Sequence, residues 1–241
     1  MTLRVHTYSN KGGRDKNEDC IHAECMDARG IFVLADGLGG HKRGEVASQT
    51  AVEALTLALK NCEKPNPAGL REAFLAANQA VLDGQKASDC KSMKTTAVVL
   101  QIAGDKAIWG HVGDSRLYHF ANGEIASVTK DQSVTYKKYL GGEISYQDIR
   151  NDEDRSSLLS VLGNEGKCSP ETPETLQTIA SGDAFLLCSD GFWEYVFDEE
   201  MLIDLLKSET TREWIDYMLL RHIKRTRPSY DNYSLIAVLV Q

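Results

Sequence analysis

The sequence has few cysteines, and they are not arranged for chemistry. The six are Cys20, Cys25, Cys62, Cys90, Cys168 and Cys188. No pair has Cys-x-x-Cys spacing, and none has a histidine partner at the distance typical of zinc ligands. No cysteine is followed six positions later by arginine, so the Cys-x5-Arg loop of cysteine-dependent phosphatases is absent. We therefore expect reduced thiols without a catalytic role.

Long apolar runs, targeting segments and excess positive charge are also missing. No segment approaches the ~18 apolar residues of a membrane span, and residues 1–10 hold no apolar core of a signal peptide. The formal net charge of -8 disfavours nucleic acid as a partner, because phosphate backbones attract basic surfaces. A nucleotide-binding G-x-x-x-x-G-K-[ST] loop is absent. We predict a cytoplasmic monomer with neither a nucleic-acid nor a membrane partner.

The apolar pattern predicts an α+β fold in one domain covering residues 1–241. With 42% hydrophobic residues, a chain of this length can bury a substantial core. Apolar residues at helical spacing predict helices at 45–59, 70–81, 199–207 and 211–225. Short apolar runs predict strands at 3–8, 31–35, 95–102, 106–112, 116–120, 184–188 and 234–240.

The connections predict how these elements pair. Gly104-Asp105 and Gly113-Asp114 are typical of hairpin turns, which makes residues 95–120 a meander after the first helix pair. Residues 133–155 are polar and predict a surface excursion. Strands grouped between helix pairs favour antiparallel sheets flanked by helices over a doubly wound parallel sheet.

Four aspartates carry the chemical signal. Asp36, Asp114 and Asp190 each follow an apolar strand-like run, and Asp231 precedes the last predicted strand. Carboxylates at the ends of several strands converge, and they repel one another unless a multivalent cation lies between them. The pattern therefore indicates a metal-dependent hydrolase.

Each of these motifs taken alone has a simpler interpretation. The glycine-rich segment after Asp36 could cradle a nucleotide phosphate, although it lacks the third glycine of G-x-G-x-x-G. Asp114 could be a hairpin residue, and Asp190 and Asp231 could belong to a turn and a capped loop.

Six motifs in order along the chain resemble the metal-dependent Ser/Thr protein phosphatases of the 2C type, the PPM family. They are Arg14-x-x-Asn17-Glu18-Asp19, Asp36-Gly37-Leu38-Gly39-Gly40-His41, Gly113-Asp114-Ser115-Arg116, Leu162-Gly163, Ser189-Asp190-Gly191 and Asp231-Asn232. The resemblance runs from about residue 6 to the C-terminus and is to the compact bacterial form. It implies a four-layer α-β-β-α sandwich, two antiparallel sheets flanked by helix pairs, with a two-metal centre at one end. Residues 133–155 would be the flap.

The resemblance implies ligands for two Mn²⁺ or Mg²⁺ ions. Asp36 would lie between both ions, since hard cations take oxygen ligands and a close pair can share a bridging hydroxide. Gly37 would offer its backbone carbonyl to the second ion, because a missing side chain lets the main chain approach closely. Asp190 and Asp231 would complete the coordination of the first ion.

Three more carboxylates have weaker assignments. Glu18 and Asp19 would act mostly through metal-bound waters, and the alternative is an exposed acidic pair in a charged loop. Asp114, together with Asp190, would hold a third and weaker ion.

Arg14 and His41 complete the implied catalytic set with Asp36. Arg14 would bind the substrate phosphate through its guanidinium fork, and the alternative is a surface arginine paired with Glu18. His41 would protonate the leaving Ser or Thr oxygen, and the alternative is a solvated loop histidine.

The expected activity is hydrolysis of phosphoserine and phosphothreonine in proteins. A metal-bridging hydroxide would attack phosphorus in line, with no covalent enzyme intermediate. Phosphorylated proteins, a Ser/Thr kinase and that kinase's substrates are the expected partners. The alternatives are a phosphatase-fold binding module with little catalysis and a hydrolase of small phosphate esters.

Two features concern substrate choice. Many bacterial relatives have Asp-His-Ser where this chain has Asp131-Gln132-Ser133, which leaves the flap contacts open. Lys42 and Arg43 give a basic rim, and residues 221–227 form a second basic run that favours a solvated helix end over a binding site.

Overall fold

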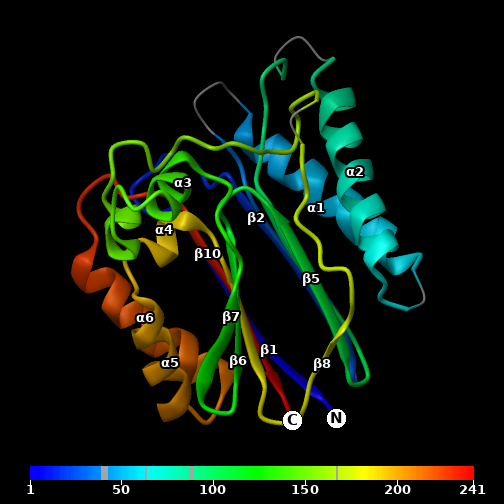
Figure 1. The fold of residues 1–241 in the computed structure, drawn as a ribbon, viewed down its shortest axis with the longest axis vertical. Helices are drawn as coiled ribbons and strands as arrows, with labels where there is room; N and C mark the ends of the chain where they lie inside the picture. Colours follow the sequence, from blue (N-terminus) through cyan, green and yellow to red (C-terminus); the bar gives the residue numbers. More distant parts are fainter. Residues whose placement is uncertain (39–42, 63, 87–89, 167) are drawn as a thin grey trace.

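The protein is a four-layer sandwich in which two sheets pack face to face and helices cover their outer faces (Figure 1). The computed structural model describes residues 1–38, 43–62, 64–86, 90–166 and 168–241. The strand orders are β1-β10-β9-β6-β7 in one sheet and β2-β3-β4-β5-β8 in the other. Neighbouring strands are antiparallel throughout these two sheets. The predicted α+β class and α-β-β-α arrangement are confirmed.

The element bounds follow the predicted ranges closely. The first sheet consists of β1 (Leu3–Asn10), β10 (Tyr233–Val240), β9 (Ala184–Cys188), β6 (Arg116–Ala121) and β7 (Glu124–Val128). The second consists of β2 (Asp19–Met26), β3 (Arg29–Asp36), β4 (Ala97–Ala103), β5 (Lys106–Val112) and β8 (Gln177–Thr178). The helices are α1 (Gly44–Lys60), α2 (Pro67–Gly84), α3 (Val134–Leu140), α4 (Asp190–Trp193), α5 (Asp198–Lys207) and α6 (Thr211–Arg225), with the 3-10 helix η2 (Tyr146–Arg150).

Alternation along the strands produces three apolar layers. On β3, Phe32 and Leu34 face the other sheet, whereas Val33 and Ala35 face the α1 and α2 side. Each strand residue points opposite to its neighbour, so a continuous apolar run such as β3 is buried on both faces. The central layer joins the two sheets, and the outer layers bury α1 and α2 on one side and α5 and α6 on the other.

Side-chain caps mark the first residues of α2 and α6. The side chain of Asn66 accepts a hydrogen bond from the Gly69 amide at 2.7 Å, and Pro67 follows as the first residue of α2. This cap satisfies an amide that has no partner within the helix, and proline at the first position loses no hydrogen bond. Thr210 caps α6 in the same way, at 3.1 Å from the Glu213 amide.

The predicted hairpin at Gly113-Asp114 is wrong. β5 pairs with β4 and β8 in one sheet, while β6 pairs with β7 and β9 in the other. Gly113-Asp114 is therefore a crossover between the sheets, and the predicted meander of residues 95–120 is interrupted there. Sequence alone could not distinguish the two, because a Gly-Asp dipeptide is typical of both. The hairpin at Gly104-Asp105 is correct, since Ala103 pairs with Lys106.

Several elements were not predicted. β2 and β7 have mixed polar and apolar composition, and half of β2 is exposed. Residues 133–155 are more than a surface excursion, because they contain α3 and η2 and because Ile149 and Arg150 are buried. Ser133 begins α3 by accepting a hydrogen bond from the Tyr136 amide at 3.2 Å.

Candidate active site

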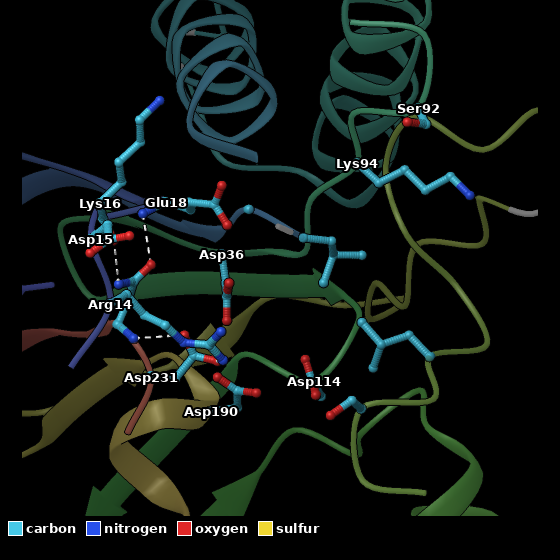
Figure 2. Close-up of a pocket in the computed structure, with 15 residues that line it drawn as sticks. Arg14, Asp15, Lys16, Glu18, Asp36, Ser92, Lys94, Asp114, Asp190 and Asp231 are labelled. Carbon is cyan, nitrogen blue, oxygen red and sulfur yellow. Dashed lines mark hydrogen bonds and ion pairs between the residues drawn. The ribbon is translucent and has the colours of Figure 1, made fainter. Parts of the chain in front are cut away.

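A pocket of about 810 Å³ lies at one end of the paired sheets. Asp231 lines this pocket and lies just before the start of β10. The other end of β10 pairs with the start of β1, at Val240 and Leu3, so the pocket lies at the opposite end of the sheets from the two chain termini (Figure 1). Figure 2 shows Asp36, Asp114, Asp190 and Asp231 directed toward the same space, with Glu18 above them. The structure therefore brings together the four aspartates singled out in the sequence.

The paired ends of β2 and β3 place two carboxylates side by side. Asp36 is the last residue of β3, and its partner across the ladder is Asp19, the first residue of β2. The main chain of Asp36 is held on its other side, where its carbonyl accepts hydrogen bonds from Thr95 Oγ1 at 2.7 Å and the Thr96 amide at 2.9 Å. Strand pairing thus fixes the Asp36 backbone independently of any ligand.

Gly37 lies where a side chain would not fit. A Cβ there would lie 2.2 Å from the Gly44 carbonyl oxygen, so the end of β3 packs backbone to backbone against the start of α1. The Gly37 amide donates to the Glu18 carbonyl at 3.1 Å, and Ser48 of α1 donates to the same carbonyl at 2.6 Å. These bonds join the loop carrying Glu18 to the loop carrying Asp36.

The other three aspartates come from three separate connections. Asp190 opens α4 directly after β9, and Asp231 is two residues before β10. Asp114 lies on the crossover between the sheets, where its carbonyl accepts a hydrogen bond from the Trp193 indole at 3.0 Å. Although the predicted hairpin was wrong, the crossover brings Asp114 to the pocket.

The pocket concentrates negative charge in a partly buried place. Burial and the neighbouring charges of Asp190, Asp19, Asp114 and Asp231 raise the pKa of Asp36 well above its usual range. Burial also raises the pKa of Asp114 and of Asp190, with a hydrogen bond to Asp36 offsetting part of the effect at Asp190. Burial raises the pKa of Asp19 to about 7. Ionising all these groups together is therefore unfavourable without added positive charge.

The donor set fits divalent metal ions. Oxygen ligands suit Mg²⁺ and Mn²⁺, and Asp19 Oδ1 and Asp190 Oδ1 are buried without a hydrogen-bond partner among the described residues. Among the described residues, no group of three Asp, Glu, His or Cys side chains is arranged closely enough to hold a metal ion without some movement of the side chains. Some oxygens are engaged elsewhere, since Ser189 Oγ donates to Asp19 Oδ2 at 2.8 Å. Metal binding must compete with such contacts.

Arg14 lies at the pocket edge and contacts a carboxylate. Its Nη2 donates to Asp231 Oδ2 at 2.7 Å, and its side chain is 55% exposed. The alternative partner Glu18 is not the one it contacts. His41 lies outside the described residues, as does Lys42, so the role assigned to His41 stays a prediction.

Asn232 is a site residue to which the sequence interpretation gave no role. Its side chain accepts from the Glu18 amide at 2.7 Å and donates to the Lys11 and Lys16 carbonyls, each at 2.8 Å. Asn232 is buried, so these bonds satisfy its amide and tie the loop of residues 11–18 to Asp231. In the sequence, the one hint of this role was that Asn232 directly follows the ligand candidate Asp231. Once Asn232 is seen to be buried, hydrogen bonds of its side chain are expected, because buried polar side chains are normally hydrogen-bonded.

Gln132, which directly precedes residues 133–155, contacts two segments outside that range. Its side-chain oxygen accepts from the Gly113 amide at 3.0 Å, and its side-chain nitrogen donates to the Ser169 carbonyl at 2.8 Å. An amide can accept and donate at once, so Gln132 fastens the Gly113-Asp114 crossover to the segment beyond the flap.

A second buried cluster lies beside the pocket and is balanced in charge. Arg116 makes two hydrogen bonds to Asp131, at 2.8 and 2.7 Å, and both side chains are 1% exposed. Arg150 donates to Asp198 Oδ1 at 2.6 Å. The Arg116 guanidinium lies 3.6 Å from the ring centre of Trp193. We call these four charged residues and Trp193 the arginine network.

The comparisons with known proteins agree with this geometry. The family described as "Protein phosphatase 2C" matches residues 8–226. The serine/threonine phosphatase Stp of Listeria welshimeri is 35% identical over 213 residues, covering 86% of this chain and 80% of that protein.

Two solved structures extend the similarity to the fold. The Mycobacterium tuberculosis serine/threonine phosphatase PstP/Ppp has a TM-score of 0.87 and 29% identity, with 100% of both chains covered. The catalytic domain of PstP in complex with two manganese ions has a TM-score of 0.82 and 29% identity, with 99% of both chains covered.

Proposed function

The chain belongs to the protein phosphatase 2C family, and from this premise we propose how its pocket hydrolyses phosphoserine and phosphothreonine. It is a metal-dependent serine/threonine protein phosphatase. The observation that supports the proposal most strongly is the convergence of four aspartates on one pocket, namely Asp36, Asp114, Asp190 and Asp231. Burial and the neighbouring negative charges make ionisation of Asp36 unfavourable there unless a cation is bound.

We propose that two ions, Mn²⁺ or Mg²⁺, bind at these carboxylates. Asp36 would contact both, with the Gly37 carbonyl at the second ion and Asp190 and Asp231 at the first. The bound ions supply an activated water and screen the charge of the phosphoryl oxygens. The protein's part is to hold its ligands on strand ends whose backbones are fixed by pairing, as at Asp36.

Glu18, Asp19 and Asp114 are proposed for outer positions. Glu18 and Asp19 would hold metal-bound waters, and Asp114 with Asp190 would hold a third, weaker ion. The pairing of Asp19 with Asp36 and the fixed backbone of Asp114 support these placements.

Arg14 is proposed to orient the phosphoryl group. Its Nη2 contacts Asp231 at 2.7 Å, and the side chain is 55% exposed, which leaves the rest of the guanidinium fork accessible to a substrate. A guanidinium in this position can hold two phosphoryl oxygens in line for attack. His41 would protonate the leaving oxygen.

The wider setting is also a proposal. We propose that the chain acts as one domain and as a cytoplasmic monomer in signalling, reversing a Ser/Thr kinase. Cys20, Cys25, Cys62, Cys168 and Cys188 are free thiols, which supports a reducing compartment. No helix in the described ranges combines the length and apolarity needed to cross a membrane.

The test is hydrolysis of a phosphothreonine peptide with Mn²⁺, with Mg²⁺ and with EDTA. We expect turnover with a metal and none with EDTA, and loss of turnover in Asp36→Ala and Asp231→Ala. Asp216→Ala, at an exposed ion pair on α6, is the matched control and keeps full activity. Metal-independent turnover would contradict the proposal.

The two alternative functions are not favoured. A binding module would show peptide binding without turnover, yet all three proposed ligands of the first ion are present at the pocket. Comparing phosphopeptides with small phosphate esters in the same assay tests the remaining alternative.

A further inference from the structure

We propose that Lys94 selects substrates that carry a second acidic or phosphorylated side chain close to the phosphorylated residue. The inference rests on the proposed function, because it concerns the part of the substrate outside the metal centre. It begins with the three basic residues that line the pocket within the described ranges, Arg14, Lys16 and Lys94.

Two of these cations already have carboxylate partners. Arg14 is paired with Asp231 at 2.7 Å, and Lys16 is paired with Glu45 at 3.0 Å. The Lys94 ammonium has no hydrogen bond or ion pair with any residue in the described ranges. Other basic candidates are engaged too, since Arg221 of the basic run is held by Asp204 at 2.6 and 2.8 Å. Lys94 is therefore the pocket cation best placed to meet an outside anion.

The main chain holds Lys94 in place. Its carbonyl accepts a hydrogen bond from the Leu38 amide at 3.0 Å, two residues after Asp36. Met93 on one side and Thr95 on the other are buried, and the Thr95 amide donates to the Leu162 carbonyl at 3.2 Å. A fixed backbone directs the side chain to the pocket, which lowers the entropy cost of using it for recognition.

The position of Lys94 points to the flank of the substrate. Figure 2 shows Lys94 on the side of the pocket away from Arg14, with its ammonium directed away from Asp36. A phosphoryl group held between Asp36 and Arg14 would lie on the other side. Lys94 is then left for a neighbouring side chain of the substrate.

Charge explains why such a residue matters here. The chain has a formal net charge of -8, so the protein as a whole repels an acidic phosphopeptide. One cation at the rim gives such a peptide a favourable contact and restricts it to one direction along the pocket.

The experiment measures kcat/KM for matched phosphothreonine peptides with Mn²⁺. One set carries a single Glu at successive positions on either side of phosphothreonine, a second carries phosphoserine at those positions, and the reference carries Gln. We expect the wild type to prefer an anionic peptide at one position by about fivefold, the size of a partly exposed ion pair. Lys94→Met removes the preference, and Lys94→Glu transfers it to a peptide with Lys at that position.

Lys91→Met is the matched control, because Lys91 is an exposed lysine three residues earlier that does not line the pocket. It should keep the preference. An equal loss on all peptides in Lys94→Met would overturn the inference by placing Lys94 on the phosphoryl group, and so would a wild type without preference. Failure of the wild type to hydrolyse any peptide would instead contradict the proposed function.

Discussion

Two charge clusters lie next to each other in this protein, one buried and one partly buried, and their charges are balanced in different ways. The arginine network pairs two arginines with two aspartates, Arg116 with Asp131 and Arg150 with Asp198. The pocket gathers Asp36, Asp114, Asp190 and Asp231, of which Asp231 is paired with Arg14 among the described residues. The first cluster is complete without a ligand, and the second requires added positive charge.

The pKa shifts express the same difference. Burial alone would lower the pKa of Arg116, but the charge of Asp131 raises it well above its usual range, so the guanidinium stays ionised. Burial raises the pKa of Asp36, and its charged neighbours raise it further. Neighbouring charges thus stabilise ionisation in one cluster and oppose it in the other.

Trp193 joins the two clusters. Its ring lies against the Arg116 guanidinium, its indole donates to the Asp114 carbonyl, and it ends the short helix that Asp190 begins. Arg150 of η2 also donates to the Trp193 carbonyl at 2.6 Å. The balanced cluster is therefore a rigid support for one wall of the unbalanced cluster.

The largest expected effect comes from breaking the balanced cluster. Asp131→Asn leaves the Arg116 guanidinium buried without its counter-ion, and we expect a loss of about 3–5 kcal/mol in unfolding free energy. Urea denaturation measures it. Asp216→Asn, which breaks an exposed pair with Arg212, is the control and should cost under about 1 kcal/mol. A similar small cost for Asp131→Asn would show that the pair is unimportant for stability.

Removing a carboxylate from the pocket should have the opposite effect on stability. Asp36→Asn lowers activity more than about 100-fold, because even an indirect metal partner can account for 10–100-fold. In EDTA its unfolding free energy should equal or exceed that of the wild type, since one of several repelling groups is gone. Kinetics and urea denaturation measure the two effects. A stability loss of several kcal/mol in EDTA would contradict the view that the pocket is unbalanced.

Arg14 provides a smaller test of the pocket's outer edge. Arg14→Lys keeps the charge but loses the fork that can hold two phosphoryl oxygens, and we expect about a tenfold fall in kcat/KM. Arg4→Lys is the control, because Arg4 is exposed on β1 and contacts Gln241 at 3.2 Å. Unchanged kinetics in Arg14→Lys would remove the role in phosphate binding.

The smallest effect concerns the link between the clusters. Trp193→Phe and Trp214→Phe each remove a buried indole hydrogen bond, to the carbonyls of Asp114 and Met201. Each should cost about 1 kcal/mol in thermal or urea unfolding. Only Trp193→Phe should also lower phosphatase activity, by a few-fold, because its bond holds a pocket residue. Equal activity in both variants would show that the link does not reach the site.

The sequence predicted the parts that depend on local pattern. Continuous apolar runs predicted β3 and β9, and helical spacing predicted α1 and α6. The position of Asp36 at the end of a strand predicted its place in the pocket. The crossover at Gly113-Asp114 was not predictable, since only long-range pairing of β6 with β9 separates it from a hairpin. Neither was the contact of Arg14 with Asp231, because 217 residues separate them along the chain. The arginine network was not predictable either, because its ion pairs join residues 15 and 48 positions apart that no local pattern connects.

The central claim is that the unbalanced carboxylate cluster binds metal, and calorimetric titration of metal-free protein with Mn²⁺ tests it most directly. We predict saturable binding of two or more ions per chain in the wild type, with strongly weakened binding in Asp36→Asn and unchanged binding in Asp216→Asn. Absence of saturable binding, or full binding in Asp36→Asn, would contradict the account.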